Sequence, residues 1–514
     1  MEGPNYMNDP TSEENKQSSK EKFLRYSIII LVFATLIGAG SRSFADPDLW
    51  GHLRFGLDTI ESGQIIQIDP YSYLTAGQRW INHELLTEIS FALAWLIGNV
   101  TGLILLKTAV VVLTLGTTFF YMLRRQVSPI MAAILVFIAW FGLQPALGTI
   151  RPHMFTMLFT AIVFIVISYA EFGRYRWLWI LPPVFIMWVN FHGGFLAGLA
   201  FLGLWSVVHT ILNRKKWRSI IPPVILSFIA VLLNPYGLDL IIFLLRTATV
   251  SRPEIVEWQP IRLMTDLGII YFIYLVISVL GMFFSRKEKP ISITILLVVA
   301  GILPLISVRH LPLFSIAMVI FAGEHIADAK SRISGGNSNP SRIQSLVAYT
   351  SIIMAFGLLL WGYFNSQHIW ITNKSIPLFP TQAVTLLQES SIEGNLAVEF
   401  NWGEYVIWHL GPEIQVSVDG RRETVYSEEI YEANLAFLSG KETWEDLIDD
   451  TDTNIALLAK NGPAYHLMKP KLGWELLYED NTSALFASEE WDQIDVLRSN
   501  AEDFVAPPPK EVFP

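Results

Sequence analysis

The chain has 514 residues, of which 52% are hydrophobic and 16% are charged, whereas soluble globular chains carry roughly 25% charged residues. This composition excludes an ordinary soluble enzyme, because the apolar residues fall in blocks that approach the roughly 20 residues needed to cross a bilayer. The sequence contains no cysteine, so disulfides, thiol nucleophiles and Cys-ligated metals are excluded too. We therefore expect a polytopic protein embedded in the lipid bilayer.

Charge divides the chain into two regions. Residues 367–514 hold 9 Lys and Arg against 26 Asp and Glu, whereas residues 1–366 hold 27 against 20. We predict that residues 367–505 form an acidic, soluble-type domain and that the Pro-rich tail at 506–514 is disordered. Nucleic acids and anionic lipid surfaces are bound by basic patches, so this acidic domain predicts no nucleic-acid partner.

The N-terminal segment, residues 1–25, is polar and lacks the small-residue cleavage pattern of a removed signal peptide. It leads into an apolar run at 26–39, which we interpret as a retained first span. Ten more runs bring the prediction to eleven spans within residues 26–366. They centre on 102–123, 129–147, 154–169, 177–189, 196–212, 220–233, 267–284, 291–306, 311–322 and 346–364.

Basic residues occur at every second connection between these runs, beginning with Arg124 and Arg125. Short loops rich in Lys and Arg stay on the cytoplasmic side. The N-terminus is therefore predicted to be cytoplasmic and, after an odd number of spans, the C-terminal domain to lie outside the plasma membrane. If segment 85–97 crossed the membrane, every later basic loop would face outward, so we expect it to be an interfacial or re-entrant helix.

Beyond the last span, short apolar strands alternate with helical stretches, a pattern typical of a small α/β domain. We expect strands at 396–400, 414–418, 455–459, 476–478 and 484–487, and helices at 381–389 and 443–448. The predicted fold class is thus an α-helical polytopic membrane protein of about eleven spans with an extracytoplasmic α/β domain.

The first outer loop, residues 42–99, is the longest connection between spans, and long loops in compact proteins are usually functional. Asp46 and Asp48 flank a proline immediately after the first span, and His83 and Glu84 precede the interfacial segment. These four residues are our candidates for general base catalysis or for binding a divalent metal such as Mg²⁺ or Mn²⁺. An alternative is that Asp46 caps a helix that starts near Asp48.

Other residues of this loop have two interpretations as well. His52 and Arg54 lie on the same predicted juxtamembrane helix and are candidates for the substrate pocket. Trp50 and Trp80 fit better as aromatic anchors at the membrane surface.

Every later outer turn carries polar residues at the end of a span, where ionisable side chains usually face the bundle or a cavity. Four such clusters on one face predict a common outward-facing site, although any single one could be a helix cap or a side chain that reaches the headgroups. Arginine suits phosphate, so we assign phosphate binding to the two basic clusters and pocket lining to the other two. The clusters are Arg151 with His153, Arg309 with His310, Asn190 with His192, and Asn234 with Tyr236.

These motifs resemble the GT-C glycosyltransferases. An acidic residue just outside the first span, the Asp69-Pro70 pair, and Gly77, Trp80 and His83-Glu84 are similar to the first outer loop of that superfamily, which includes protein O-mannosyltransferases, lipid A aminoarabinose transferases and oligosaccharyltransferase catalytic subunits. DPDLWGHLRFG, the NHE and RPH motifs, NWGEYVIWHL and VDGRRE more closely resemble a group of bacterial multi-span proteins placed in the superfamily. The resemblance covers nearly the whole chain.

The resemblance implies a sugar donor on a polyprenyl phosphate or pyrophosphate carrier and transfer on the outer face of the membrane to a glycan, lipid or protein acceptor. It implies that Asp46, with Asp48 second, acts as the base on the acceptor or orients it. Segment 401–405 stands where oligosaccharyltransferases carry a Trp-Trp-Asp motif and lacks that sequence, so recognition of their peptide acceptor is not implied. Two alternatives stay open: a transporter or flippase of a lipid-linked substrate, and a non-catalytic subunit of a cell-envelope complex.

Overall fold

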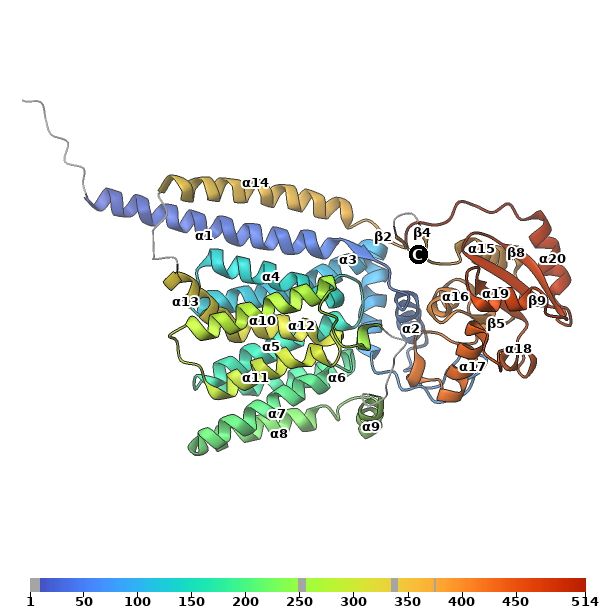
Figure 1. Ribbon diagram of the computed structural model, residues 1–514, viewed down its shortest axis with the longest axis horizontal. Coiled ribbons are helices and arrows are strands. Elements are labelled where there is room, and N and C mark those ends of the chain that lie inside the picture. Colours follow the sequence, from blue (N-terminus) through green and yellow to red (C-terminus); the bar gives the residue numbers. More distant parts are fainter. Residues whose placement is uncertain (1–9, 248–255, 334–340, 374–375) are drawn as a thin grey trace, which may run out of the picture.

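The computed structural model describes residues 10–247, 256–333, 341–373 and 376–514. A bundle of long helices forms one end of the molecule and a C-terminal domain built on a β-sheet forms the other (Figure 1). Within the described ranges, eight helices are long and apolar enough to cross a membrane. They are α1 (Pro10–Ser41), α3 (Leu85–Arg124), α4 (Pro129–Leu147), α5 (His153–Glu171), α7 (Phe195–Leu212), α10 (Asp266–Phe284), α12 (Leu311–Ala317) continued through the π-helical η6 (Met318–Ala322) into α13 (Gly323–Ile333), and α14 (Ser341–Asn365).

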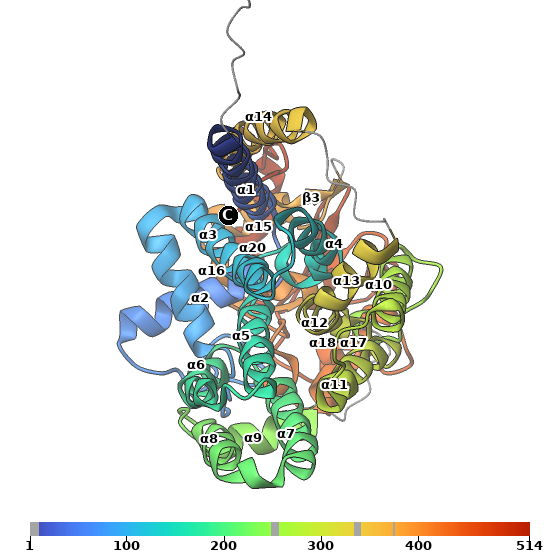
Figure 2. The ribbon, with the colours of Figure 1, turned by 90° about the vertical axis from the view of Figure 1, so that its left-hand side faces the viewer.

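Three of the eleven predicted spans correspond to shorter helices, so the count of eleven stays a prediction. Segment 177–189 forms η1 (Tyr175–Ile180) and α6 (Leu181–Phe191), segment 220–233 forms α8 (Trp217–Ala230), and segment 291–306 forms α11 (Ile291–Ile302) and η4 (Leu303–Leu305). Prolines occupy the first turn of α6, where the missing N–H is tolerated. These helices lie within the bundle (Figure 1). Viewed along the bundle, α5 lies near the centre, and α1 and α14 pack together at its edge (Figure 2).

Segment 85–97 is the first limb of α3, which bends sharply. Gly98 and Asn99 leave helical geometry, with φ of −152° and 48°. The second limb packs so closely on the first that a Cβ at Gly102 would lie 1.9 Å from the carbonyl oxygen of Ala94, so only glycine fits there. The first limb runs across the end of the bundle rather than along it (Figure 1). A position at the membrane surface stays a prediction.

The first loop and the C-terminal domain lie at the same end of the bundle, and α13 and the connection from α7 to α8 lie at the opposite end (Figure 1). A parallel pair of short strands, β1 (Ser43–Phe44) and β2 (Ile369–Trp370), joins the exit of α1 to the chain that follows α14. Which side of the membrane each end faces stays a prediction.

The C-terminal domain contains a five-stranded mixed sheet in the order β6-β5-β7-β9-β8, and all five predicted strands are present. Strands β6, β5 and β7 are parallel, and β9 and β8 continue the sheet antiparallel. The strands are β5 (Gly394–Val398), β6 (Ile414–Val416), β7 (Ile455–Ala459), β8 (Trp474–Glu479) and β9 (Ser483–Ser488), and a short hairpin, β3 (Thr372–Asn373) and β4 (Ile376–Pro377), precedes them. The helices are α15 (Thr381–Ser390), η7 (Phe400–Trp402), α16 (Gly403–Leu410), η8 (Arg422–Thr424), α17 (Glu428–Ser439), α18 (Asp446–Asp449), α19 (Pro463–Met468) and α20 (Ile494–Asp503).

The first loop is built into this domain. It contains α2 (Leu49–Ser62) and an extended segment whose backbone pairs with the edge strand β6. Tyr73 N–H donates to the carbonyl of Val416 at 3.2 Å, and Val416 N–H donates to the carbonyl of Tyr71 at 3.1 Å. The loop thereby covers a sheet edge that would otherwise leave backbone groups unpaired.

Two predictions for aromatic residues and the tail are wrong. Trp50 and Trp80 are buried rather than placed at the lipid surface, with exposed fractions of 0% and 2%. The tail is ordered: Phe513 N–H donates to the carbonyl of Ile369 at 2.9 Å, and its ring lies 5.0 Å from that of Trp50. Both errors have one cause, since the apolar surface of α2 is covered by the C-terminal domain and the tail instead of by lipid.

Candidate active site

A cavity of about 770 Å³ lies where the bundle, the first loop and the C-terminal domain meet. The bundle side comes from the turn after α1, the turn between α4 and α5, the turn between α6 and α7, and the segments around η3 (Val256–Trp258) and η5 (Val308–His310). The ionisable residues that line it are Asp46, Asp48, His52, His83, Glu84, Glu88, Arg151, His153, His192, Glu257, Arg309, Glu404, Arg421, Arg422 and Tyr431.

Asp46 and Asp48 share one arginine. Arg151 places Nε 3.3 Å from Asp46 Oδ1, donates from Nη2 to Asp48 Oδ2 at 3.0 Å, and lies 3.6 Å from Glu257. Asp46 Oδ1 also accepts from the N–H of Asp48 at 3.2 Å, but Asp48 is the cap residue of α2 and no side chain caps that helix, so the capping alternative for Asp46 is not observed. The guanidinium predicted to bind donor phosphate is therefore surrounded by three carboxylates.

Lys107 links the turn that carries Asp46 to the turn that carries Arg151. Its fully buried Nζ donates to the carbonyl of Arg42 at 2.6 Å and to that of Gly148 at 3.0 Å. These carbonyls follow the ends of α1 and α4, where backbone acceptors lack partners within the helix. A lysine in the middle of an apolar span thus joins the turn of Asp46 to the turn of Arg151.

Asp46 is set up to exchange a proton near neutral pH. Burial, opposed by Arg151 and assisted by Asp48, raises its pKa from 3.8 to about 6. Burial lowers the pKa of Arg151, but the neighbouring carboxylates outweigh it and raise that pKa, so this arginine is charged throughout the physiological range. A general base works best when its pKa lies near the working pH, which Asp46 satisfies.

Imidazoles and carboxylates form a second network beside the first. His52 lies 3.5 Å from Glu88 and 3.8 Å from Glu84, and Asn82 donates to the other oxygen of Glu88 at 2.5 Å. Burial opposes protonation of His52, but Glu88 and Glu84 outweigh it and raise its pKa to about 9. The pKa of Glu84 is lowered despite burial, because His83 and His52 face it. This network supplies a second fixed cation to the cavity.

Two further histidines, His192 and His153, line the cavity next to each other. Their ring centroids lie 4.4 Å apart, and His192 Nδ1 lies 2.8 Å from the hydroxyl of Thr156. Burial lowers the pKa of His192 to about 3, so it is a neutral imidazole at physiological pH. Arg309 closes this side, with NH2 3.4 Å from His153 Nε2 and its guanidinium 4.2 Å from the Trp258 ring centroid.

Five predicted residues are absent from the cavity wall. Arg54 pairs with Asp58 at 3.0 Å, and Tyr236 and the ring Nδ1 of His310 are buried elsewhere. Asn190 donates to the carbonyls of Ile186 and Leu233, and Asn234 to those of Val231 and Gly237. The two asparagines thus satisfy backbone acceptors at helix ends, which is the capping alternative for polar residues in such turns.

The sequence analysis missed the contribution of the C-terminal domain. Arg421 donates to Asp69 at 2.7 Å and twice to Asp419, while its guanidinium lies about 5 Å from the centroids of three rings of the first loop. Glu404 accepts from the N–H of Gly51 at 3.1 Å. Glu404 and Arg421 lie in NWGEYVIWHL and VDGRRE, two motifs that carry the family resemblance, but nothing in the sequence placed them beside the first loop.

The predicted metal ligands do not assemble as a metal site. In the described part of the chain, no three His, Asp or Glu side chains come together as a group that could hold a metal ion. Asp46 and Asp48 face Arg151, whereas His83 and Glu84 belong to the imidazole network. A divalent metal at these residues stays a prediction, and no step below depends on one.

No sequence-family profile and no curated protein matches the chain, but solved structures do. ArnT from Cupriavidus metallidurans in the apo state matches with a TM-score of 0.56 and 13% identity, over 90% of this chain and 97% of that one. The Archaeoglobus fulgidus oligosaccharyltransferase, in complex with Zn and sulfate, matches with a TM-score of 0.53 and 12% identity, over 91% and 73% of the two chains. Both neighbours are GT-C glycosyltransferases.

The chain has the GT-C fold. This confirms the predicted fold class, a multi-pass helical membrane protein with a C-terminal domain that contains a sheet. Within this GT-C fold, the residues carrying the resemblance at Asp46 and Glu84 line one cavity together with Arg151 and Arg309. At these identities the likeness concerns the fold alone.

Proposed function

We propose that the protein is a membrane glycosyltransferase that transfers a sugar from a polyprenyl-phosphate-linked donor to an acceptor on the outer face of the membrane. The observation that carries the proposal is the cavity itself, which combines a buried carboxylate of pKa about 6, Asp46, with fixed cations at its rim. A base and cations in one cavity match the needs of displacement at a sugar carbon.

In the proposed step, the acceptor oxygen attacks the anomeric carbon of the donor while Asp46 takes the acceptor proton. The bond between that carbon and the carrier phosphate breaks, and the phosphate leaves with the electron pair. Arg309 lies at the cavity wall beside the Trp258 ring and is placed to balance the negative charge that grows on the phosphate. Arg151 acts on Asp46 and Asp48, so we assign the phosphate contact to Arg309 first.

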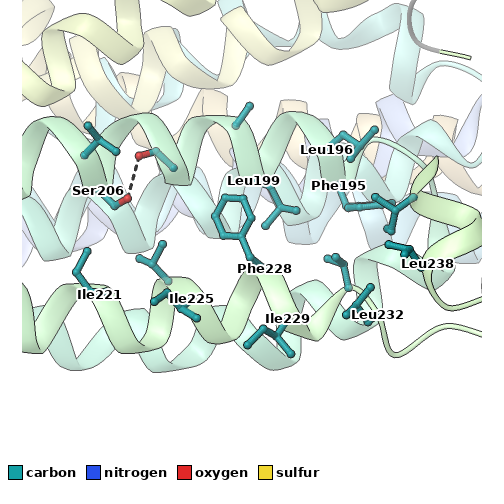
Figure 3. A pocket seen from close by; sticks show the side chains of 16 residues that line it. Phe195, Leu196, Leu199, Ser206, Ile221, Ile225, Phe228, Ile229, Leu232 and Leu238 are labelled. Carbon is teal, nitrogen blue, oxygen red and sulfur yellow. Dashed lines mark hydrogen bonds between the residues drawn. The ribbon is translucent and has the colours of Figure 1, made fainter. Parts of the chain in front are cut away.

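An apolar groove supports a lipid-linked donor. It has a volume of about 910 Å³ and lies between α7, α8 and α9 (Leu238–Thr247), lined almost wholly by Leu, Ile, Val and Phe (Figure 3). Phe195, at one end of the groove, stands three residues from His192 in the cavity wall. A prenyl chain in the groove would leave its phosphate near the His192 turn, within the polar cavity.

The test is transfer by purified protein in liposomes containing synthetic polyprenyl-phosphate sugars. Wild type should release the carrier phosphate and glycosylate an acceptor, and Asp46→Asn should bind donor but turn over at least about a hundredfold more slowly. Asp239→Asn is the matched control, because Asp239 forms an exposed ion pair with Arg79 and is absent from the cavity wall. Full turnover by Asp46→Asn would reject the assignment of the base.

A further inference from the structure

Arg422 is the second of two consecutive arginines in the turn that follows β6 in the C-terminal domain. It lines the cavity, and only 7% of its surface is exposed. Its guanidinium lies 4.1 Å from the ring centroid of Tyr431, which the Phe400 ring supports at 5.8 Å, and both rings line the cavity too. A guanidinium stacked on a ring directs its N–H groups outward around its edge, where a planar oxyanion can accept two of them.

The backbone of Arg422 is held in an unfavourable conformation. Its φ is 28°, in the left-handed region that residues other than glycine rarely adopt. The carbonyl of Arg422 accepts from the N–H of Tyr426 at 2.7 Å, and the hydroxyl of Tyr426 donates to Asp419 at 2.7 Å. On the other side, Arg421 donates to Asp69 of the first loop at 2.7 Å. Neighbouring contacts thus fix the turn, and backbone strain that is fixed in this way is typical of functional sites.

The turn that carries Arg422 packs on the turn that carries Asp46 and Asp48. A Cβ built on Gly420 would lie 2.6 Å from Asp48 Oδ1, so the two turns are in direct contact. A ligand group bound by Arg422 is therefore held beside the turn of Asp46, the proposed base. The proposed donor contact, Arg309, belongs to the bundle, as does the apolar groove assigned to the carrier.

The charge of the domain makes a cation at this position informative. Residues 367–514 hold 9 Lys and Arg against 26 Asp and Glu, so the domain as a whole repels an anionic ligand. In the part of the chain that the structure describes, Arg421 and Arg422 are the basic residues that the domain contributes to the cavity wall. Arg421 is committed to Asp419 and Asp69, both at 2.7 Å. The turn therefore presents Arg422 as the cation that an acidic ligand meets on this wall.

We propose that Arg422 binds an oxyanionic group of the acceptor, a carboxylate or a phosphate, and thereby selects acidic acceptors over neutral ones. This inference rests on the proposed glycosyltransferase function and names the chemical class of its acceptor. The donor and the acceptor are then held by arginines on different walls, Arg309 on the bundle and Arg422 on the domain. Each guanidinium lies about 4 Å from an aromatic ring, that of Trp258 or that of Tyr431.

The first test measures binding of inorganic phosphate to the purified full-length protein, without donor or acceptor, by broadening of the phosphorus NMR line. Arg422→Gln and Arg309→Gln should each reduce the broadening, and the double variant should reduce it by the sum of the two. Arg422→Gly should reduce it as Arg422→Gln does, and its turn should fold because glycine adopts a φ of 28° without strain. Broadening equal to that of wild type in both Arg422 variants would overturn the proposal.

Arg498→Gln is the matched control for the loss of a positive charge from the acidic domain. Arg498 pairs with Glu475 at 2.7 Å and is absent from the cavity wall. Its replacement should leave the phosphate line and the transfer kinetics as in wild type. An equal effect of Arg498→Gln would also overturn the proposal, because the effect would then follow from the net charge of the domain.

The second test assigns the oxyanion to the acceptor, with octyl glucuronide and octyl glucoside as probes and a synthetic polyprenyl-phosphate sugar as donor. Wild type should prefer the glucuronide by at least about tenfold in kcat/KM. Arg422→Gln should raise the KM for the glucuronide by roughly tenfold to a hundredfold and leave the donor KM unchanged. Equal use of the two acceptors would overturn the assignment. A donor KM that rises only for a pyrophosphate-linked donor would also overturn it, because Arg422 would then bind the second phosphate of the donor.

The two tests separate this inference from the proposed function. If phosphate binding depends on Arg422 and no sugar is transferred to either acceptor, the glycosyltransferase function fails while the oxyanion site stands. If transfer proceeds and phosphate binding is the same without Arg422, the function stands and the oxyanion site fails.

Discussion

Arg151→Gln should move the pH dependence of catalysis rather than the affinity for donor. The guanidinium lies 3.3 Å from Asp46, and an arginine so placed lowers a carboxyl pKa by roughly 1–3. The pKa of Asp46, about 6 in wild type, should therefore rise to roughly 7–9 in the variant. Because a base is active only when deprotonated, kcat/KM at pH 7 should fall about tenfold for a pKa near 8 and should recover at pH 9.

The assay is kcat/KM with a synthetic polyprenyl-phosphate sugar from pH 5 to 9, on variants that elute from size exclusion as wild type does. Arg151→Lys is the matched control, since it keeps a cation beside Asp46. It should leave the acid limb of the pH profile, the fall of kcat/KM toward low pH, near pH 6. The reasoning is refuted if Arg151→Gln keeps that limb and instead raises the donor KM. Such a result would mean that Arg151 contacts the carrier phosphate.

Three further outcomes are expected. Arg309→Gln should weaken binding of a polyprenyl-phosphate analogue by roughly tenfold to a hundredfold. Arg309→Lys should weaken it by less, because lysine keeps the positive charge and loses only the paired hydrogen bonds of the guanidinium. Unchanged binding in both variants would reject the phosphate role. In intact cells, an impermeant thiol reagent should label Ser427→Cys but not Ser338→Cys, a position outside the described residues; the chain has no cysteine to give background, and the reverse pattern would overturn the topology. Transfer should survive EDTA, since the cavity's carboxylates face Arg151 and imidazoles; loss that Mg²⁺ or Mn²⁺ restores would make Asp46, Asp48, His83 and Glu84 the ligands to examine.

The sequence sufficed for residues whose place follows from hydropathy. Asp46, Arg151 and Arg309 each stand at the end of an apolar run, and spans that alternate in direction bring such ends to a common face of the bundle. It did not suffice for Asn190 and Asn234, because a polar residue at a helix end can face a cavity or bond the last carbonyls, and only packing decides between the two.

Contacts between segments far apart in the chain could not be predicted from the sequence, for a different reason. Asp69 and Arg421 are separated by more than three hundred residues, and neither hydropathy nor periodicity relates them. Trp50 was assigned to the membrane surface because an aromatic residue beside a span fits both the interface and a buried contact with a second domain. The structure resolves that ambiguity through the rings of Phe379, Tyr405 and Phe513, which cover Trp50.

The interlocking of loop and domain bears on how the cavity keeps its shape. Arg421 ties Asp69 to the domain, Glu404 ties Gly51, and Lys107 ties the turns that carry Asp46 and Arg151. Each tie is a hydrogen bond of a buried side chain, and its loss would leave a desolvated group without a partner, a cost of roughly 1–3 kcal/mol. Such contacts hold the acids and cations of the cavity at fixed separations, and charges fixed in this way can stabilise a transition state without reorganising. The sheet-containing domain, although outside the helical bundle, therefore forms one wall of the cavity.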